Sequence, residues 1–256
     1  MALQILRHAF FMIYRNFGQA LRVSVGPYLV LLAGFALFVA LFQERLNLLG
    51  SPGAAGTLSG ADAGIIFLGL TGMAIFGLLI FSWVAVSWHR FVLLEEYSGA
   101  LPAFSDRPIG AYAGRSILYA LLLVIVAIPL VLVLGPLATI GPLVMQWVVG
   151  LALVSVLTFV WLRIALALPS VAVGQPIRMG EAWAASAPLS GAIFGVSVLL
   201  VGLSGFADSL STAVMVAIPV MGFVLNIAIQ WLIIMLGVSI LTTLYGHLIE
   251  KRPLID

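Results

Sequence analysis

The sequence contains no cysteine, one lysine and few charged residues of any kind. Without cysteine, the chain cannot form a disulfide, a thiolate metal site or a cysteine nucleophile. Charged residues make up 8% of the chain and hydrophobic residues 63%, whereas soluble domains carry about 25% charged residues. This inventory cannot cover a surface that faces water, and a formal net charge of +2 is too small to indicate nucleic-acid binding.

Short motifs of catalysis are missing as well. The sequence has no Ser-His-Asp arrangement, no His-Glu-x-x-His zinc motif and no glycine-rich phosphate loop. The three histidines, His8, His89 and His247, lie near one predicted membrane face, and they alone do not indicate a metal site. We therefore expect a protein that is not an enzyme and binds neither a metal nor a cofactor. A cleavable signal peptide is not expected either, because no small-residue cleavage site follows a short apolar core.

What the sequence does contain is six apolar runs of spanning length. A helix needs about 20 apolar residues to cross the hydrocarbon core of a bilayer, and short connections leave no room for a separate soluble domain. The fold class predicted is all-α, a single integral membrane domain over residues 1–256. The expected spans are 23–42, 64–88, 115–134, 143–168, 189–206 and 214–245.

The segment before the first span is predicted to be a basic amphipathic helix. Leu6, Phe10 and Ile13 recur at steps of three or four, which places them on one helical face. Basic and polar residues collect on another face. Such a helix lies in the plane of the membrane interface or packs on the protein's own surface, and the sequence leaves both interpretations open.

The distribution of arginine predicts the orientation of the spans. With both termini in the cytoplasm, ten of the eleven basic residues lie on that side and only Arg45 lies outside. This asymmetry follows the positive-inside rule. The excess of arginine over lysine, in a chain rich in Ala, Gly, Val and Leu, is typical of GC-rich bacterial genomes. The expected location is the bacterial inner membrane.

A pattern at the ends of the spans indicates an internal repeat. Aligning Arg90 with Arg163 also aligns Trp88 with Trp161. We therefore predict three parallel hairpins, each preceded by an interfacial amphipathic helix on the cytoplasmic side. The alternative is that any helix ending at this face gathers Trp and Arg.

Few polar residues are candidates for a binding site. Arg90, Arg115 and Arg163 could gather around a lipid phosphate, which arginine binds bidentately. For Arg163 we favour a simpler interpretation, in which its long side chain extends to the headgroups. Asn226 and Gln230 are four residues apart and share a face of the last span. We expect them to bond to a neighbouring helix rather than to a solute.

Two short stretches carry a resemblance to a known family. They are Tyr14-Arg15-Asn16-Phe17 before the first span and Gly180-Glu181-Ala182-Trp183-Ala184-Ala185-Ser186 before the fifth. With its six-span layout, the chain resembles a poorly characterised bacterial inner-membrane family. That family is similar to the membrane domain that precedes the catalytic domain in some glycerophosphodiester phosphodiesterases. The resemblance implies the membrane fold and not the activity, because the phosphodiesterase domain has no counterpart among these residues.

The function expected from these features is non-catalytic. The chain would act as an accessory or scaffold subunit of a larger membrane complex, or would organise lipid. Its partners would be membrane lipids and another membrane protein. The alternative is a carrier or channel for a lipid or a small neutral solute, based on Asn226, Gln230, the glycine-rich second span and the prolines that can kink helices.

Overall fold

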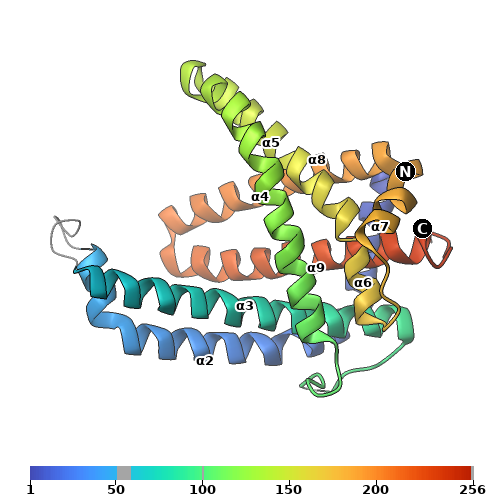
Figure 1. The fold of residues 1–256 in the computed structure, drawn as a ribbon, viewed down its shortest axis with the longest axis horizontal. Helices are drawn as coiled ribbons and strands as arrows, with labels where there is room; N and C mark the ends of the chain where they lie inside the picture. Colours follow the sequence, from blue (N-terminus) through green and yellow to red (C-terminus); the bar gives the residue numbers. More distant parts are fainter. Residues whose placement is uncertain (51–58, 100, 255–256) are drawn as a thin grey trace.

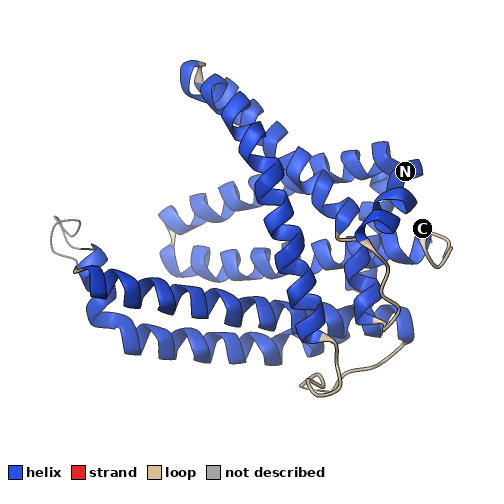
Figure 2. Cartoon of the chain, viewed as in Figure 1, coloured by secondary structure: helices blue, strands red, loops and turns tan. Residues whose placement is uncertain are grey.

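The structure is an all-helical membrane protein. The computed structural model describes residues 1–50, 59–99 and 101–254, and these residues form helices and no strand (Figure 2). Six stretches are long and apolar enough to cross a membrane, which confirms the predicted all-α, multi-pass architecture. The stretch 50–62, rich in Gly, Ala, Ser and Pro, predicts a loop; its residues 51–58 lie outside the described residues, and a helix already begins at Gly60. In chain order the helices are α1 (Ala2–Arg15), α2 (Phe17–Gly50), α3 (Gly60–Leu94), α4 (Ile109–Ile140), α5 (Leu143–Ile164), α6 (Ala167–Ala172), α7 (Met179–Ser186), the 3₁₀ turn η2 (Ala187–Leu189), α8 (Ser190–Ala217) and α9 (Pro219–Leu248).

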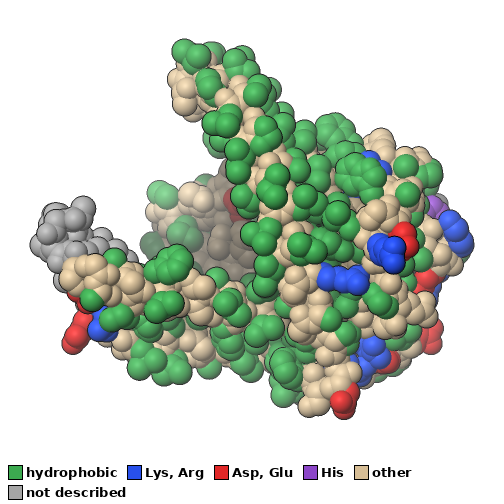
Figure 3. Space-filling view, viewed as in Figure 1, with side chains coloured by type: hydrophobic (Ala, Val, Ile, Leu, Met, Phe, Trp, Pro, Cys, Tyr) green, Lys and Arg blue, Asp and Glu red, His purple; other side chains and the backbone are tan. Residues whose placement is uncertain are grey.

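The helices meet in what we call the buried base, at the end of the molecule where both termini lie (Figure 1). Its continuous buried stretches are 82–89 of α3, 162–172 around α6 and 239–246 of α9. Trp88 and Tyr245 are the largest of its fully buried side chains. Most basic side chains visible in Figure 3 gather at this same end.

Away from the base the helices diverge. Helices α2 and α3 run side by side, as do α8 and α9, while α4 and α5 form an arm at a steep angle to both pairs (Figure 1). The surface is hollowed between the arm and the helices beside it (Figure 3). Leu132 on α4 and Phe67 on α3 are 71% and 69% exposed. The outer parts of the helices therefore present bare apolar surface.

The boundary between α8 and α9 differs from the prediction. We expected a turn at Asp208 after a span ending at Phe206, but α8 continues through Asp208 to Ala217, so that boundary is wrong. The helix breaks at Ile218, and Pro219 begins α9 instead of lying inside a span from 214. Proline fits the first turn of a helix because the N–H that it lacks would have no partner there.

The N-terminal segment also differs in detail. The amphipathic helix predicted for the segment before the first span, residues 2–22, breaks at Asn16, whose side-chain amide donates to the Met12 carbonyl. Ile5, Ala9 and Ile13 form the buried face of α1, which packs on α8 and α9. Phe10, which we placed on the apolar face, is 42% exposed. Helix α1 thus packs on the protein through a face that is rotated about the helix axis relative to the predicted apolar face.

Tryptophans near the end of an apolar run, such as Trp83 and Trp88, predict a position at the membrane interface, but both are buried in the base. The Trp83 indole N–H donates to the Ala103 carbonyl at 3.3 Å, which ties the loop after α3 back to the helix. A tryptophan near the end of an apolar run can lie at a membrane interface or in a protein core. Here the ends of several helices bury both tryptophans.

Candidate functional site

Arg90 is held by the protein's own groups. Its Nε donates to Glu96 Oε2 at 2.9 Å and its Nη1 to the Ala172 carbonyl at 2.8 Å. Arg107 forms a second ion pair with Glu96 at 2.6 Å. The hydrogen bond from Arg90, helped by the charges of both arginines, holds the pKa of Glu96 below its ordinary value. Arg90 therefore joins the end of α3 to α6.

Arg163 does not extend to the headgroups, so the interpretation favoured from the sequence is wrong. Its guanidinium lies over the Trp183 ring, 3.7 Å from the ring centroid, and the residue is 7% exposed. Nε donates to Ser186 Oγ at 2.9 Å and Nη2 to the Trp183 carbonyl at 2.6 Å. Helix α7 folds over Arg163 and supplies the partners that water or lipid would otherwise provide.

Arg115 has a third set of partners, so the three candidate arginines do not share an acceptor. Its Nη1 donates to the Ile177 carbonyl at 2.9 Å. Because a guanidinium carries five N–H donors, this bond orients the side chain without exhausting its capacity to bind an anion. Of the three predicted headgroup ligands, Arg115 is the one that lines a pocket between α4 and the segment before α7.

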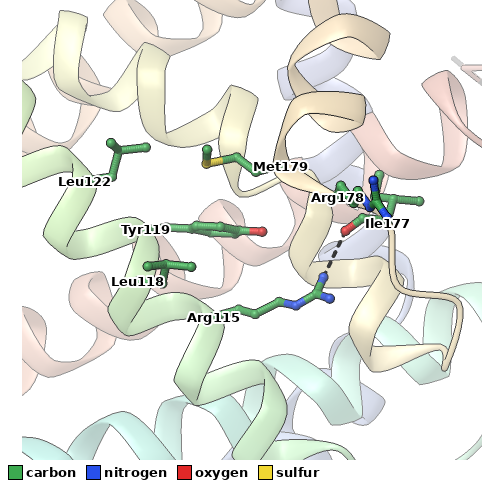
Figure 4. A pocket seen from close by; sticks show the side chains of 7 residues that line it. All are labelled: Arg115, Leu118, Tyr119, Leu122, Ile177, Arg178 and Met179. Carbon is green, nitrogen blue, oxygen red and sulfur yellow. Dashed lines mark hydrogen bonds between the residues drawn. The ribbon is translucent and has the colours of Figure 1, made fainter.

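That pocket has a volume of about 330 Å³. Its apolar wall comes from α4, while Arg115 reaches across to Ile177 and Arg178 lies beside that residue (Figure 4). Glu181 accepts a hydrogen bond from the backbone N–H of Arg178, not from its side chain. The lining consists of Arg115, Leu118, Tyr119, Leu122, Ile177, Arg178 and Met179.

His89 forms a buried hydrogen-bonded centre in the base. Its Nδ1 lies 2.8 Å from Thr242 Oγ1 and its Nε2 lies 3.2 Å from the Tyr112 hydroxyl. Thr242 Oγ1 donates its own hydrogen to the Val238 carbonyl, so it accepts from His89 Nδ1–H. In that tautomer Nε2 accepts from the Tyr112 hydroxyl. The fully buried imidazole thus links α3, α4 and α9.

The two polar residues of the last span bond to the helix beside it. Asn226 Nδ2 donates to Ser211 Oγ at 3.2 Å, and Gln230 Nε2 donates to Asp208 Oδ1 at 2.7 Å. Both acceptors lie on α8. The shared face that the sequence indicated is therefore turned toward α8.

Sequence reasoning did not identify Arg178, Tyr112 or Thr242 as parts of a site. Arg178 was visible only as one more basic residue of the predicted cytoplasmic face. The partners of His89 lie 23 and 153 residues away along the chain, and no local pattern signals such contacts. Among the described residues, no group of three or more His, Asp or Glu side chains could hold a metal ion.

Comparisons with known proteins assign no family: no protein-family model, no curated protein and no solved structure matches the chain. The resemblance to the membrane domain of glycerophosphodiester phosphodiesterases stays a prediction.

Proposed function

We propose that this chain is a non-catalytic integral membrane protein that serves as an accessory or scaffold subunit of a larger membrane complex, or organises lipid. The observation that carries the proposal is the divergence of the helices from the buried base (Figure 1). In a bilayer, the apolar surface between the diverging helices must be covered by acyl chains or by helices of another protein.

The apolar surface is most extensive on α4. Only 6% of its most apolar 18-residue stretch is buried within the protein. Phe67 on α3 and Phe223 on α9 are also more than half exposed. The polar groups of α8 and α9 turn toward one another instead, through Gln230 and Asp208. Surfaces of this kind favour contacts with lipid or with a partner in the membrane.

The proposal includes three parallel hairpins, in the bacterial inner membrane, with both termini in the cytoplasm. The side-by-side packing of α2 with α3, α4 with α5 and α8 with α9 supports the hairpins. The excess of basic residues near the base supports the orientation.

Native purification in lipid nanodiscs tests the main proposal. A photoreactive phenylalanine analogue in place of Leu132 or Phe67 should cross-link to one stoichiometric membrane protein or to retained lipid. The same analogue at Leu101, which is 60% exposed in the loop after α3, serves as the control. Recovery of the protein alone, with neither a stoichiometric partner nor retained lipid, would contradict the proposal.

A second candidate is a carrier or channel for a lipid or small neutral solute. It is favoured by Asp208, a carboxylate in a span-length helix, together with Gln230 and Asn226 nearby. Ionisable groups within spans often mark a transport pathway. Flux of a solute or lipid in vesicles containing the purified protein, lost in the Asp208→Asn variant, would favour this candidate over the first.

A further inference from the structure

The pocket beside α4 combines positive charge with an apolar wall. Two of its seven lining residues are arginines and none is acidic. Its volume, about 330 Å³, is at the lower end of the range for ligand sites. This is enough room for a small charged group and the first part of an attached apolar chain.

The charges of this pocket are not neutralised by ion pairs. In the described part of the chain, Arg45, Arg90, Arg107 and Arg252 each pair with a carboxylate, whereas Arg115 and Arg178 do not. Arg178 is exposed and lines the pocket. The Ile177 carbonyl fixes Arg115 in place. Two guanidinium groups on one pocket suit the oxygens of a phosphate group.

The apolar wall continues along the exposed side of α4. Leu118 lines the pocket, and Leu121 and Ile125 follow on the same helix, with exposed fractions of 60%, 57% and 64%. Arg115 is about 9 Å from the start of α4, given a rise of about 1.5 Å per residue. A ligand held by Arg115 would therefore extend from the polar end of the helix into the hydrocarbon region.

We propose that this pocket binds the phosphate of an anionic phospholipid, with Arg115 and Arg178 as its ligands. Leu118, Leu122 and Met179 contact the first part of the acyl chains, and the rest of the chains lies along α4. The inference rests on the proposed membrane function and names a lipid class for it. Two cations without a carboxylate partner favour a lipid with net negative charge over a zwitterionic one, whose positively charged ammonium group they would repel.

Native mass spectrometry of the full-length protein in detergent provides the test. Phosphatidylglycerol and phosphatidylcholine with identical acyl chains are the two probes, and phosphatidylglycerol should bind more tightly. The Arg178→Gln variant should weaken phosphatidylglycerol binding roughly fivefold, the upper range for an exposed ion pair. Arg115→Gln should weaken it about tenfold or more, because this guanidinium is held in position.

The controls separate local recognition from overall charge and from folding. The Arg7→Gln/Arg15→Gln double variant removes two charges from α1, where neither residue lines the pocket, and it should bind lipid as the original protein does. Arg178→Gln keeps the backbone N–H that bonds to Glu181, so it should fold normally. Glycerol phosphate at millimolar concentration should not displace the lipid, because it lacks the acyl chains that contact α4.

Three outcomes would overturn the inference. The two lipids could bind equally, the Arg178→Gln and Arg115→Gln variants could keep the original affinity, or the α1 double variant could lose as much affinity as they do. Displacement by glycerol phosphate would overturn it too, by showing a site for a soluble anion. None of these outcomes affects the cross-linking experiment, in which a partner or lipid is captured at Leu132 or Phe67. The failure of this inference is thus distinguishable from the failure of the proposed function.

Discussion

At the scale of single residues, the charged side chains of the base act as structural connectors. Arg163 shows how this works: stacking on Trp183 and bonding to Ser186 replace the hydration that a buried guanidinium loses. A hydrogen bond that involves a charged group contributes roughly 1.5–3 kcal/mol, so these contacts outweigh the advantage of extending the side chain into water. The sequence could not show these contacts, because Trp183 and Ser186 lie on α7, 20 and 23 residues after Arg163.

Glu96 offers a test that depends on pH. The arginine contacts hold its pKa below the ordinary value, so its contribution to stability is present above the unfolded pKa of about 4.3. The contribution is lost as pH falls through the lower, folded pKa. We expect Glu96→Gln to lower the melting temperature in detergent by about 2 °C at pH 7, as a loss of under 1 kcal/mol implies. The difference should be smaller at pH 3 than at pH 7.

The neighbouring Glu95 is the matched control. It lies one residue earlier, and no ion pair in the described part of the chain involves it. Glu95→Gln should therefore leave the melting temperature unchanged at both pH values. If the effect of Glu96→Gln were as large at pH 3 as at pH 7, the loss would not come from the ionised carboxylate.

At the scale of helices, two hydrogen bonds between polar side chains join α8 and α9, and we call them the polar seam: Asn226 to Ser211 and Gln230 to Asp208. Gln230→Leu removes the amide that donates to Asp208 and leaves the carboxylate without that donor. Hydrogen bonds between membrane helices contribute about 0.6 kcal/mol on average and up to about 1.7. We expect a loss of about 1 kcal/mol, measured by thermal or sodium dodecyl sulfate unfolding.

Gln146→Leu is the control for this seam, since it is an equivalent change on α5 at an exposed side chain. The side chain of Gln146 has no hydrogen-bond partner among the described residues, and its loss should leave stability unchanged. Equal effects of the two substitutions would mean that hydrophobicity, and not the bond to Asp208, sets the stability. Loss of transport without loss of stability in Gln230→Leu would point to the carrier.

The helices also show what the sequence could and could not predict. The six spans were predictable, because each needs a long apolar run whatever its neighbours are. The end of α8 was not predictable. A carboxylate such as Asp208 after an apolar run indicates a turn, and the sequence does not show that Gln230 of the next helix donates a hydrogen bond to it. Arg115 was identified as a candidate ligand, but Arg178 and the pocket between them depend on how the segment before α7 crosses α4.

At the scale of the whole molecule, the buried base and the diverging ends should lie on opposite sides of the membrane. The natural absence of cysteine makes this directly testable, because any single cysteine introduced is the only thiol. Tyr97, near the base, is 77% exposed, and Ile140, at the far end of α4, is 82% exposed. Both side chains tolerate replacement, since neither is packed in the core.

With the base in the cytoplasm, a membrane-impermeant maleimide added to intact cells should label the Ile140→Cys variant and not Tyr97→Cys. Permeabilised cells should show both labelled, which controls for accessibility. The reverse pattern would contradict the orientation that the basic residues predict. Labelling of both variants in intact cells would contradict a crossing by α4 itself. Because arginine gathers where the helices pack together, the expected pattern would place the buried base, and the arginine pocket beside it, at the cytoplasmic leaflet.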